Sequence, residues 1–382
     1  MNPFAGLLEV TLIATLAAMG CSLIGPVLLL RKRVLLGDAV SHSMLAGIAI
    51  AYLLHRVVDS PWLRVGAALS GCLAAWLSTR LTALFRGRSD AALGLIFPFF
   101  FSLGALILSL VAANTHLDVD QVLSGNLEAS WLERVRLFGT DWGPIAAWNM
   151  AVAVLVLLTL GWIGWRDLQL YLFDPQQGLV LGRPMVLMEN LVVLSATTVI
   201  VLAFDSMGPI LVVALLTGPG ICGWLLARQL PGFFLIAQMA GILSVFTGVA
   251  LAGTLDLNLA GAIGFMAFLV TGTALILAPN HGVLARLLQA RRAQARFVAR
   301  LLAVHVRQHE IKGDYTRENC LESLCDHLGL SKKDVMAGSA WLTTRELAEW
   351  HGQVLTTTQT GKDFARTLAE GQEFPEQENL AD

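Results

Sequence analysis

The chain has 382 residues, of which 55% are hydrophobic and only 14% charged, and its mean hydropathy is +0.66. This composition excludes an average soluble domain and indicates a polytopic membrane protein, all-α in fold class. The formal net charge of −2 says little about partners, because the charges gather in loops and at the C-terminal end.

Long apolar runs predict nine membrane spans, or eight if one run does not cross. Gly25-Pro26, Gly208-Pro209 and Gly218-Pro219-Gly220 interrupt these runs, which predicts broken or kinked helices and close helix contacts. The runs are Leu7 to Leu30, Ala39 to Leu54, Val65 to Leu84, Ala91 to Ala112, Pro144 to Trp165, Val186 to Phe204, Pro209 to Ala227, Phe233 to Ala252 and Leu257 to Ala278.

The distribution of Lys and Arg predicts the orientation. With the N-terminus outside, the inner loops carry most of the basic residues and the C-terminal domain is cytosolic, as the positive-inside rule requires. The outer segment from Asn114 to Gly143 holds five acidic residues. It reads either as a vestibule that concentrates cations or, the interpretation we favour, as an ordinary solvated loop. The acidic residues are Asp118, Asp120, Glu128, Glu133 and Asp141.

Asp38 and His42 lie at the start of the second apolar run, just after the basic triplet 31–33. At helical spacing the two side chains share one face. If Arg33 marks the headgroup boundary, a rise of about 1.5 Å per residue places Asp38 roughly 7 Å deep and His42 roughly 14 Å deep. Ionisable groups at that depth are costly, so by default they face the interior of a helix bundle or a transported ion. The structural alternative is Asp38 as a helix N-cap, with His42 bonded to a backbone carbonyl.

After Ala278 the composition changes. Residues from Leu284 onward hold 13 of the 26 basic and 14 of the 28 acidic residues, with no run long enough to span a membrane. The sequence therefore predicts a transmembrane domain over 1–285, a cytosolic domain over 286–370 and a disordered acidic tail over 371–382. Three predicted helices and a two-stranded wing are typical of a winged helix. The elements are helices at Ala290 to His309, Arg317 to Leu328 and Ser331 toward Glu349, an extended segment at Gln353 to Gln359, a turn at Gly361 and a helix at Asp363 to Glu370.

Several motifs occur in a family order. The run Gly37-Asp38-Ala39-Val40-Ser41-His42-Ser43, with Gly47 downstream, resembles the signature of the permease subunits of manganese, zinc and iron ABC importers. Further matches follow over about residues 5 to 285, although Ser124 stands where the family usually has an aromatic residue. They are Ser89-Asp90-Ala91-Ala92-Leu93-Gly94, Asp118 to Leu127, Phe173-Asp174-Pro175 with Gly182, Gly208 to Pro219 and Pro279-Asn280-His281-Gly282.

The resemblance implies a type II ABC importer in the bacterial inner membrane. Its implied partners are a cytosolic ATPase, a second permease that is identical or paralogous, and an extracytoplasmic metal-binding lipoprotein or periplasmic protein. No Gly-x-x-x-x-Gly-Lys-Ser/Thr loop is present, since Thr356 stands where the first glycine would precede Gly361-Lys362, so ATP hydrolysis falls to the partner. By resemblance, the coupling segment for the ATPase contains Phe173, Asp174, Pro175 and Gly182.

The ligand types restrict the metal. A carboxylate and an imidazole suit Mn(II), Fe(II) or Zn(II) rather than Cu(I), and the sequence does not choose among the three. The metal is cargo, and no permanently bound cofactor is expected. A metal-dependent enzyme is disfavoured because no span carries His-Glu-x-x-His. A cation channel, the other rival, lacks a filter-like repeat and does not explain the coupling segment.

The C-terminal domain resembles the winged-helix part of metal-dependent repressors, an extension that some of these permeases carry. We expect a regulatory or docking module. The alternative is a membrane-tethered regulator whose tail binds DNA, but a balance of 13 basic against 14 acidic residues argues against nucleic-acid binding. His305, His309, Cys320 and Cys325 are candidates for a metal sensor, although ordinary core cysteines and solvated histidines are the favoured interpretation.

Overall fold

The computed structural model describes residues 3–56, 61–85, 88–111, 127–137, 140–279 and 282–370. The chain forms two compact units, Met1–Pro279 and Asn280–Asp382, which divide six residues before the expected boundary at 285. The predicted disordered tail at 371–382 and residues 118–126 of the outer-loop motif lie outside the described residues.

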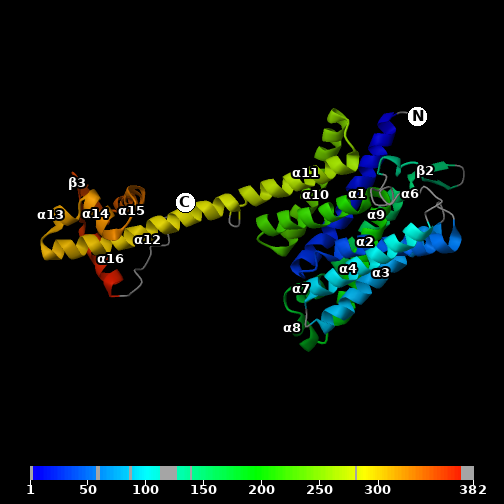
Figure 1. Ribbon diagram of the computed structural model, residues 1–382, viewed down its shortest axis with the longest axis horizontal. Helices are drawn as coiled ribbons and strands as arrows, with labels where there is room; N and C mark the ends of the chain where they lie inside the picture. The colour runs from blue at the N-terminus through cyan, green and yellow to red at the C-terminus, as the bar shows by residue number, and fades with distance from the viewer. Residues whose placement is uncertain are drawn as a thin grey trace. The chain divides into compact units, whose positions relative to one another are not determined.

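Unit 1 is a bundle of long apolar helices (Figure 1). Seven of the described helices are long and apolar enough to cross a membrane, with α9 counted once; α3 is not among the seven. The elements of unit 1 are α1 (Pro3–Leu30), α2 (Leu36–His55), α3 (Pro61–Leu84), α4 (Ser89–Val111), the 3-10 helix η2 (Leu127–Ala129), β1 (Arg134–Leu137), β2 (Thr140–Pro144), α6 (Ile145–Ile163), α7 (Trp165–Phe173), α8 (Pro175–Val180), α9 (Met185–Leu226), α10 (Leu230–Leu255) and α11 (Leu259–Leu277).

Helix α9 consists of two segments joined at Gly208, whose φ of 75° and ψ of 166° are accessible to glycine and strained for other residues. The neighbours of the two segments show that the chain reverses there. Along α1, Gly20 lies against Val199, then Gly25 against Leu216, and Arg33 pairs with Glu189. Measured along α1, Leu216 therefore lies between the positions of Val199 and Glu189. The chain has turned back after Gly208, so residues 185–207 and 209–226 form a helical hairpin. This matches the two separate spans that the sequence predicts.

Glycines allow the helices of unit 1 to approach closely. A Cβ on Gly25 would lie 1.9 Å from the Leu216 carbonyl oxygen, and one on Gly47 would lie 2.0 Å from the Gly66 carbonyl oxygen. Such contacts are typical of small-residue interfaces between membrane helices. Helix α1 nevertheless continues through Pro26, so the Gly25-Pro26 interruption marks a close contact rather than a break.

Two sets of ion pairs mark opposite ends of the bundle. At the Arg33 end, Arg33 pairs with Glu189 at 2.5 Å and Arg31 donates to the Tyr171 carbonyl at 3.1 Å. At the Arg64 end, the guanidinium of Arg134 in β1 makes a two-point contact with Glu9 at 2.8 and 2.9 Å. This pairing, with Asp141 as a further partner, raises the pKa of Arg134 and fixes the β1–β2 hairpin to α1.

Unit 2 has its own hydrophobic core, built around the buried face of its first helix. Leu302 and Val306 of that helix are fully buried, and so are Leu324 and Leu355 from later elements. The elements are α12 (Val283–Lys312), α13 (Tyr315–Glu318), α14 (Leu321–Leu328), α15 (Lys332–Thr344), β3 (Ala348–His351), β4 (Val354–Thr357) and α16 (Gln359–Ala369), with β3 and β4 antiparallel.

The sequence prediction of unit 2 was correct for one helix start and wrong at several places; the second helix, predicted over Arg317 to Leu328, is divided into α13 and α14. The Ser331 side chain caps α15 by accepting from the Asp334 amide at 3.2 Å, as predicted. The third helix ends at Thr344 rather than near Glu349, which lies in β3. Gly361 is not a turn but lies inside α16, where a Cβ would come 1.8 Å from the Leu347 carbonyl oxygen. Its role is close approach rather than backbone reversal.

Candidate functional site

Asp38 and His42 contact each other on α2. His42 Nε2 lies 3.2 Å from Asp38 Oδ1, and the two side chains are 24% and 42% exposed, for His42 and Asp38 respectively. The rings of Phe97 and Phe101 on α4 surround the imidazole edge-on, with centroids 4.9 and 5.6 Å away. His42 Nδ1 is buried without a hydrogen-bond partner among the described residues. The pair thus offers carboxylate and imidazole donors beside an aromatic wall.

The structural alternative for this pair is wrong in its details. Helix α2 begins at Leu36 with Leu35 at the N-cap, so Asp38 lies inside the first turn and caps nothing. His42 contacts the Asp38 carboxylate rather than a backbone carbonyl. Neither side chain is therefore explained by completing the backbone hydrogen bonds of α2.

Close packing holds α2 in place around the pair. Ser70 of α3 donates to the Ser43 carbonyl at 2.9 Å, one residue beyond His42. On the other side, a Cβ on Gly104 of α4 would lie 2.7 Å from the Ala46 backbone nitrogen. Because α3 and α4 both meet α2 at backbone distance, the position of His42 is fixed by two neighbouring helices.

The segment of α7 and α8 presents an apolar surface at the Arg33 end. Phe173 is 67% exposed and Val180 is 86% exposed. Asp174 caps α8 by accepting from the Gln177 amide at 2.9 Å, and Pro175 occupies the first turn. Gly182, with φ at +71°, makes the turn that leads into α9. The four residues that the sequence selected for coupling therefore define one short, exposed helical segment.

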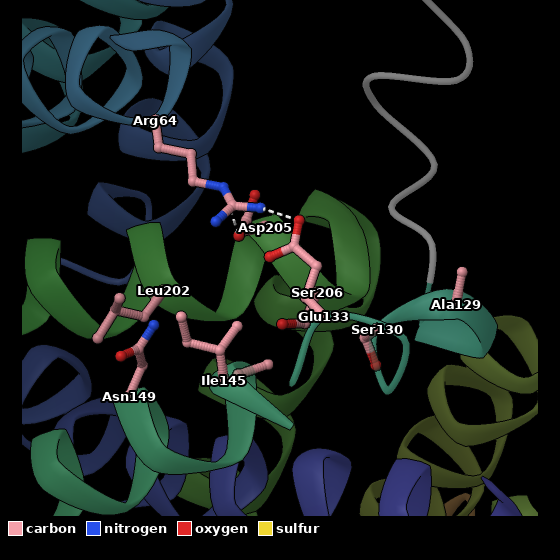
Figure 2. Close-up of a pocket in the computed structure, with 10 residues that line it drawn as sticks. Arg64, Ala129, Ser130, Glu133, Ile145, Asn149, Leu202, Asp205 and Ser206 are labelled. Atoms are coloured by element: carbon pink, nitrogen blue, oxygen red, sulfur yellow. Dashed lines mark hydrogen bonds and ion pairs between the residues drawn. The ribbon is translucent and has the colours of Figure 1, made fainter. Parts of the chain in front are cut away.

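A second polar site lies at the Arg64 end, and the sequence analysis missed it. Figure 2 shows the Arg64 guanidinium directed at the carboxylates of Glu133 and Asp205. Arg64 Nη2 lies 2.5 Å from Glu133 Oε1, and Arg64 Nε lies 3.4 Å from Asp205 Oδ2. The pocket of about 210 Å³ is also lined by Asn149 and Ser206. No local spacing signals this site, because its charged residues come from three separate segments.

The acidic outer segment is neither simply a vestibule that concentrates cations nor simply a solvated loop. Glu133 pairs with Arg64, and Asp141 pairs with Arg134 at 2.6 Å. Glu128 accepts from the backbone amide of Leu259 at 3.2 Å, at the start of α11. The described acids of this segment are thus structural contacts, whereas Asp118 and Asp120 lie outside the described residues.

The metal-sensor candidates of unit 2 separate into two groups. His305 and His309 lie one turn apart on α12, and His327 of α14 joins them, with one ring nitrogen of each within 4.8 Å of the others. Cys320 and Cys325 do not belong to this group. Cys320 donates to the Arg317 carbonyl at 3.2 Å, and Cys325 packs against the core of unit 2. The sequence analysis selected the two cysteines, whereas the structure places His327 beside the two histidines of α12.

The histidine cluster has distinct electrostatic surroundings. Burial, reinforced by the neighbouring His309 and His327, lowers the pKa of His305. A hydrogen bond between His309 Nδ1 and Asp314 Oδ1 at 2.9 Å lowers the pKa of the Asp314 carboxyl. His327 Nδ1 similarly lies 3.1 Å from Glu318 Oε2.

Long apolar helices, one of which carries the Asp38–His42 pair, are typical of a multi-pass membrane protein. The model of the ABC 3 transport family matches residues 4–278. The chain belongs to this family. It is the membrane-spanning permease of an ABC transporter, and not its ATPase subunit.

Named relatives agree with this assignment. The zinc transport system membrane protein TroD of Treponema pallidum is 32% identical over 360 residues, which cover 94% of this chain and 98% of TroD. The manganese transport system membrane protein MntD of Bacillus subtilis is 35% identical over 291 residues, covering 75% of this chain and 97% of MntD. Because the TroD match covers 94% of the chain, it extends well into unit 2.

The fold also resembles that of a solved structure. PsaBC from Streptococcus pneumoniae in complex with Fab aligns with a TM-score of 0.59 and 24% identity, over 73% of this chain and 94% of the matched chain. This likeness supports a shared fold for the membrane unit.

Proposed function

We propose that this permease imports a divalent transition metal, Mn, Zn or Fe, and that Asp38 and His42 form part of the cation site on its path. The family match over residues 4–278 and the names of the zinc and manganese relatives support the metal class. The same match favours transport over the alternative of a membrane-tethered DNA-binding regulator.

The observation that carries the proposal is the Asp38–His42 pair itself. A carboxylate and an imidazole lie 3.2 Å apart on an apolar helix, and neither is used to cap it. Transition metals of this class accept mixed nitrogen and oxygen ligands, commonly four or more. Two side chains from one chain leave such a shell incomplete. A second permease that contributes its own pair would complete it, which supports a dimeric path.

The orientation follows from the basic residues. Arg31 and Arg33 stand at the end of the bundle where α7 and α8 lie, together with Arg183, which pairs with Asp167 at 3.3 Å. By the positive-inside rule this Arg33 end faces the cytosol. The N-terminus and the Arg64 pocket then face outward, toward a metal-binding lipoprotein or periplasmic protein that delivers the ion. Counting the α9 hairpin as two crossings and including α3 as a span gives nine crossings in this type II importer bundle.

The ATPase would dock on the α7–α8 segment. Exposed Phe173, Leu179 and Val180 form an apolar surface on the cytosolic side in this orientation. The Asp174 cap and the Gly182 turn fix the shape of the segment. Such a surface suits a partner that must push on the permease during its ATP cycle.

Unit 2 is a winged-helix-like module in this proposal. Its helices α12, α14 and α15 and the β3–β4 hairpin follow the order expected of that fold. The TroD match through this region supports a module that accompanies such permeases, in a docking or regulatory role.

The test compares Asp38→Ala, His42→Ala and a matched control, His55→Ala. His55 ends the same helix and stacks on Trp62 with ring centroids 5.3 Å apart, away from the proposed site. Uptake of radioactive metal should be abolished in the first two variants and retained in the control, while all three still co-purify with the ATPase. The ligand assignment fails if either Asp38→Ala or His42→Ala transports normally.

A further inference from the structure

We propose that His305, His309 and His327 form a binding site for a divalent transition metal in unit 2, separate from the transport path. Their ligand nitrogens lie within 4.8 Å of one another, although the residues come from two different helices. The ring centroids of His305 and His309 are 4.6 Å apart, and that of His327 lies 6.0 and 6.4 Å from them. A metal bound here would link α12 to α14.

The backbone brings the three rings together in a simple way. His305 and His309 are four residues apart, so they share one face of α12. Helix α14 carries His327 in its last turn and packs on the core beside α12 through Leu324, which is fully buried. The three histidines thus lie on two helices whose relative position is already fixed by a shared hydrophobic core.

Two carboxylates orient the rings for ligation. His309 Nδ1 contacts Asp314 and His327 Nδ1 contacts Glu318, at 2.9 and 3.1 Å. A carboxylate accepts the Nδ1 proton of each ring, which leaves the Nε2 lone pair free for a metal. Glu318 is itself held by the Ser323 hydroxyl at 2.9 Å. This carboxylate–histidine arrangement is the outer shell that metal-binding histidines commonly have.

The Nε2 atom of His305 gives the strongest indication of a bound metal. Its Nε2 is buried and has no hydrogen-bond partner among the described residues. Burying an imidazole nitrogen without a partner is unfavourable, and a metal ion would satisfy it. The three rings therefore present one unsatisfied nitrogen and two nitrogens left free by their carboxylate partners.

Metal binding requires the three ligand nitrogens to move slightly closer together. Two nitrogens bound to one tetrahedral zinc ion, at 2.0–2.1 Å each, lie about 3.4 Å apart. The His327 side chain is 49% exposed and can rotate toward the buried ring, whereas that of His309 is only 15% exposed. Three imidazoles with an open fourth position favour Zn²⁺ or Co²⁺ over Mn²⁺, which prefers oxygen ligands.

Other nearby groups are already engaged. Glu310 accepts from the Thr357 amide at 2.6 Å and pairs with Arg307 at 3.3 Å, which ties it to β4. The two cysteines of unit 2 lie outside the group. The proposed metal ligands are therefore three imidazoles, and carboxylates contact the outer nitrogens of two of them.

The experiment uses the full-length protein in detergent, stripped of metal with a chelator. Zn²⁺ binding is measured by competition with a chromophoric chelator, and Co²⁺ binding by its visible absorption. His327→Gln is the leading variant because its ring is the most exposed of the three, and His309→Gln is the second. His351→Gln is the matched control, since it alters an exposed histidine of unit 2 outside the cluster.

The wild type and His351→Gln should bind one more equivalent of Zn²⁺ tightly than His327→Gln and His309→Gln. Removal of even an outer-shell partner weakens metal sites by about 10–100-fold, so loss of a ligand should weaken this site at least that much. Asp38 and His42 are present in all four proteins and contribute the same background. Zn²⁺ should also raise the unfolding temperature of unit 2 in the wild type and the control only.

Equal Zn²⁺ stoichiometry and affinity in all four proteins would overturn the proposal. Circular dichroism of the metal-free variants checks that each remains folded. The readout is binding rather than uptake, so failure of this site leaves the transport proposal untouched, and loss of transport in an Asp38 variant leaves this one untouched.

Discussion

Replacing Gly47 by alanine should disturb both the stability of the permease and its transport. A Cβ at this position would lie 2.0 Å from the Gly66 carbonyl oxygen and 2.4 Å from the Ser70 hydroxyl. An ordinary contact needs about 3.4 Å, so α2 and α3 must move apart by roughly 1.4 Å. The shift would also stretch the 2.9 Å hydrogen bond from Ser70 to the Ser43 carbonyl beyond bonding distance.

The expected cost combines two effects. Overpacking costs about 1–3 kcal/mol, and a lost interhelical hydrogen bond in a membrane protein adds about 0.6 kcal/mol. The free energy of unfolding should therefore fall by roughly 1.6–3.6 kcal/mol. Because His42 lies on the same helix and binding sites tolerate displacements of only about 0.5 Å, uptake should fall at least about tenfold.

Thermal unfolding in detergent and metal uptake in cells measure the two effects. Gly253→Ala in α10 is the matched control, since a Cβ there meets nothing within 4 Å, and it should leave both quantities unchanged or raise the stability slightly. A Gly47→Ala protein with wild-type unfolding and wild-type uptake would refute the argument that glycine packing positions α2.

Two further predictions concern the ends of the molecule. Asp174→Ala removes the cap of α8, at a local cost of about 1 kcal/mol, and should reduce co-purification of the ATPase, whereas Gln177→Ala keeps the backbone amide and should not. Full ATPase recovery with Asp174→Ala would count against this docking segment. Truncation after Arg296 should leave a permease that inserts and binds its ATPase, because the family match ends at residue 278. A truncated chain that no longer inserts would instead assign unit 2 a structural role.

The sequence could predict the features that depend on local spacing. Asp38 and His42 are four residues apart on one helix, so their contact follows from helix geometry. The Ser331 cap is equally local. The Arg64 pocket could not be predicted, because Glu133 and Asp205 reach Arg64 only through the tertiary fold.

In unit 2, too, contacts within one helix could be predicted from the sequence, whereas contacts between helices could not. His305 and His309 form a recognisable pair on α12, but the choice of His327 over Cys320 as their neighbour depends on how α14 packs. Gly361 was misassigned because glycine serves both in turns and in close contacts. Only the position of the Leu347 carbonyl distinguishes the two uses here.

The first segment of α9 connects the two ends of the bundle mechanically. It begins at Met185, which packs against Gly178 of α8, and runs over residues 185–207 to the Gly208 reversal beside Asp205. At about 1.5 Å per residue this segment is roughly 34 Å long, comparable to the hydrocarbon thickness of a bilayer. A displacement of α8 that moves Met185 therefore moves one continuous helix that ends beside the Arg64 pocket. No loop interrupts this helix between its two ends.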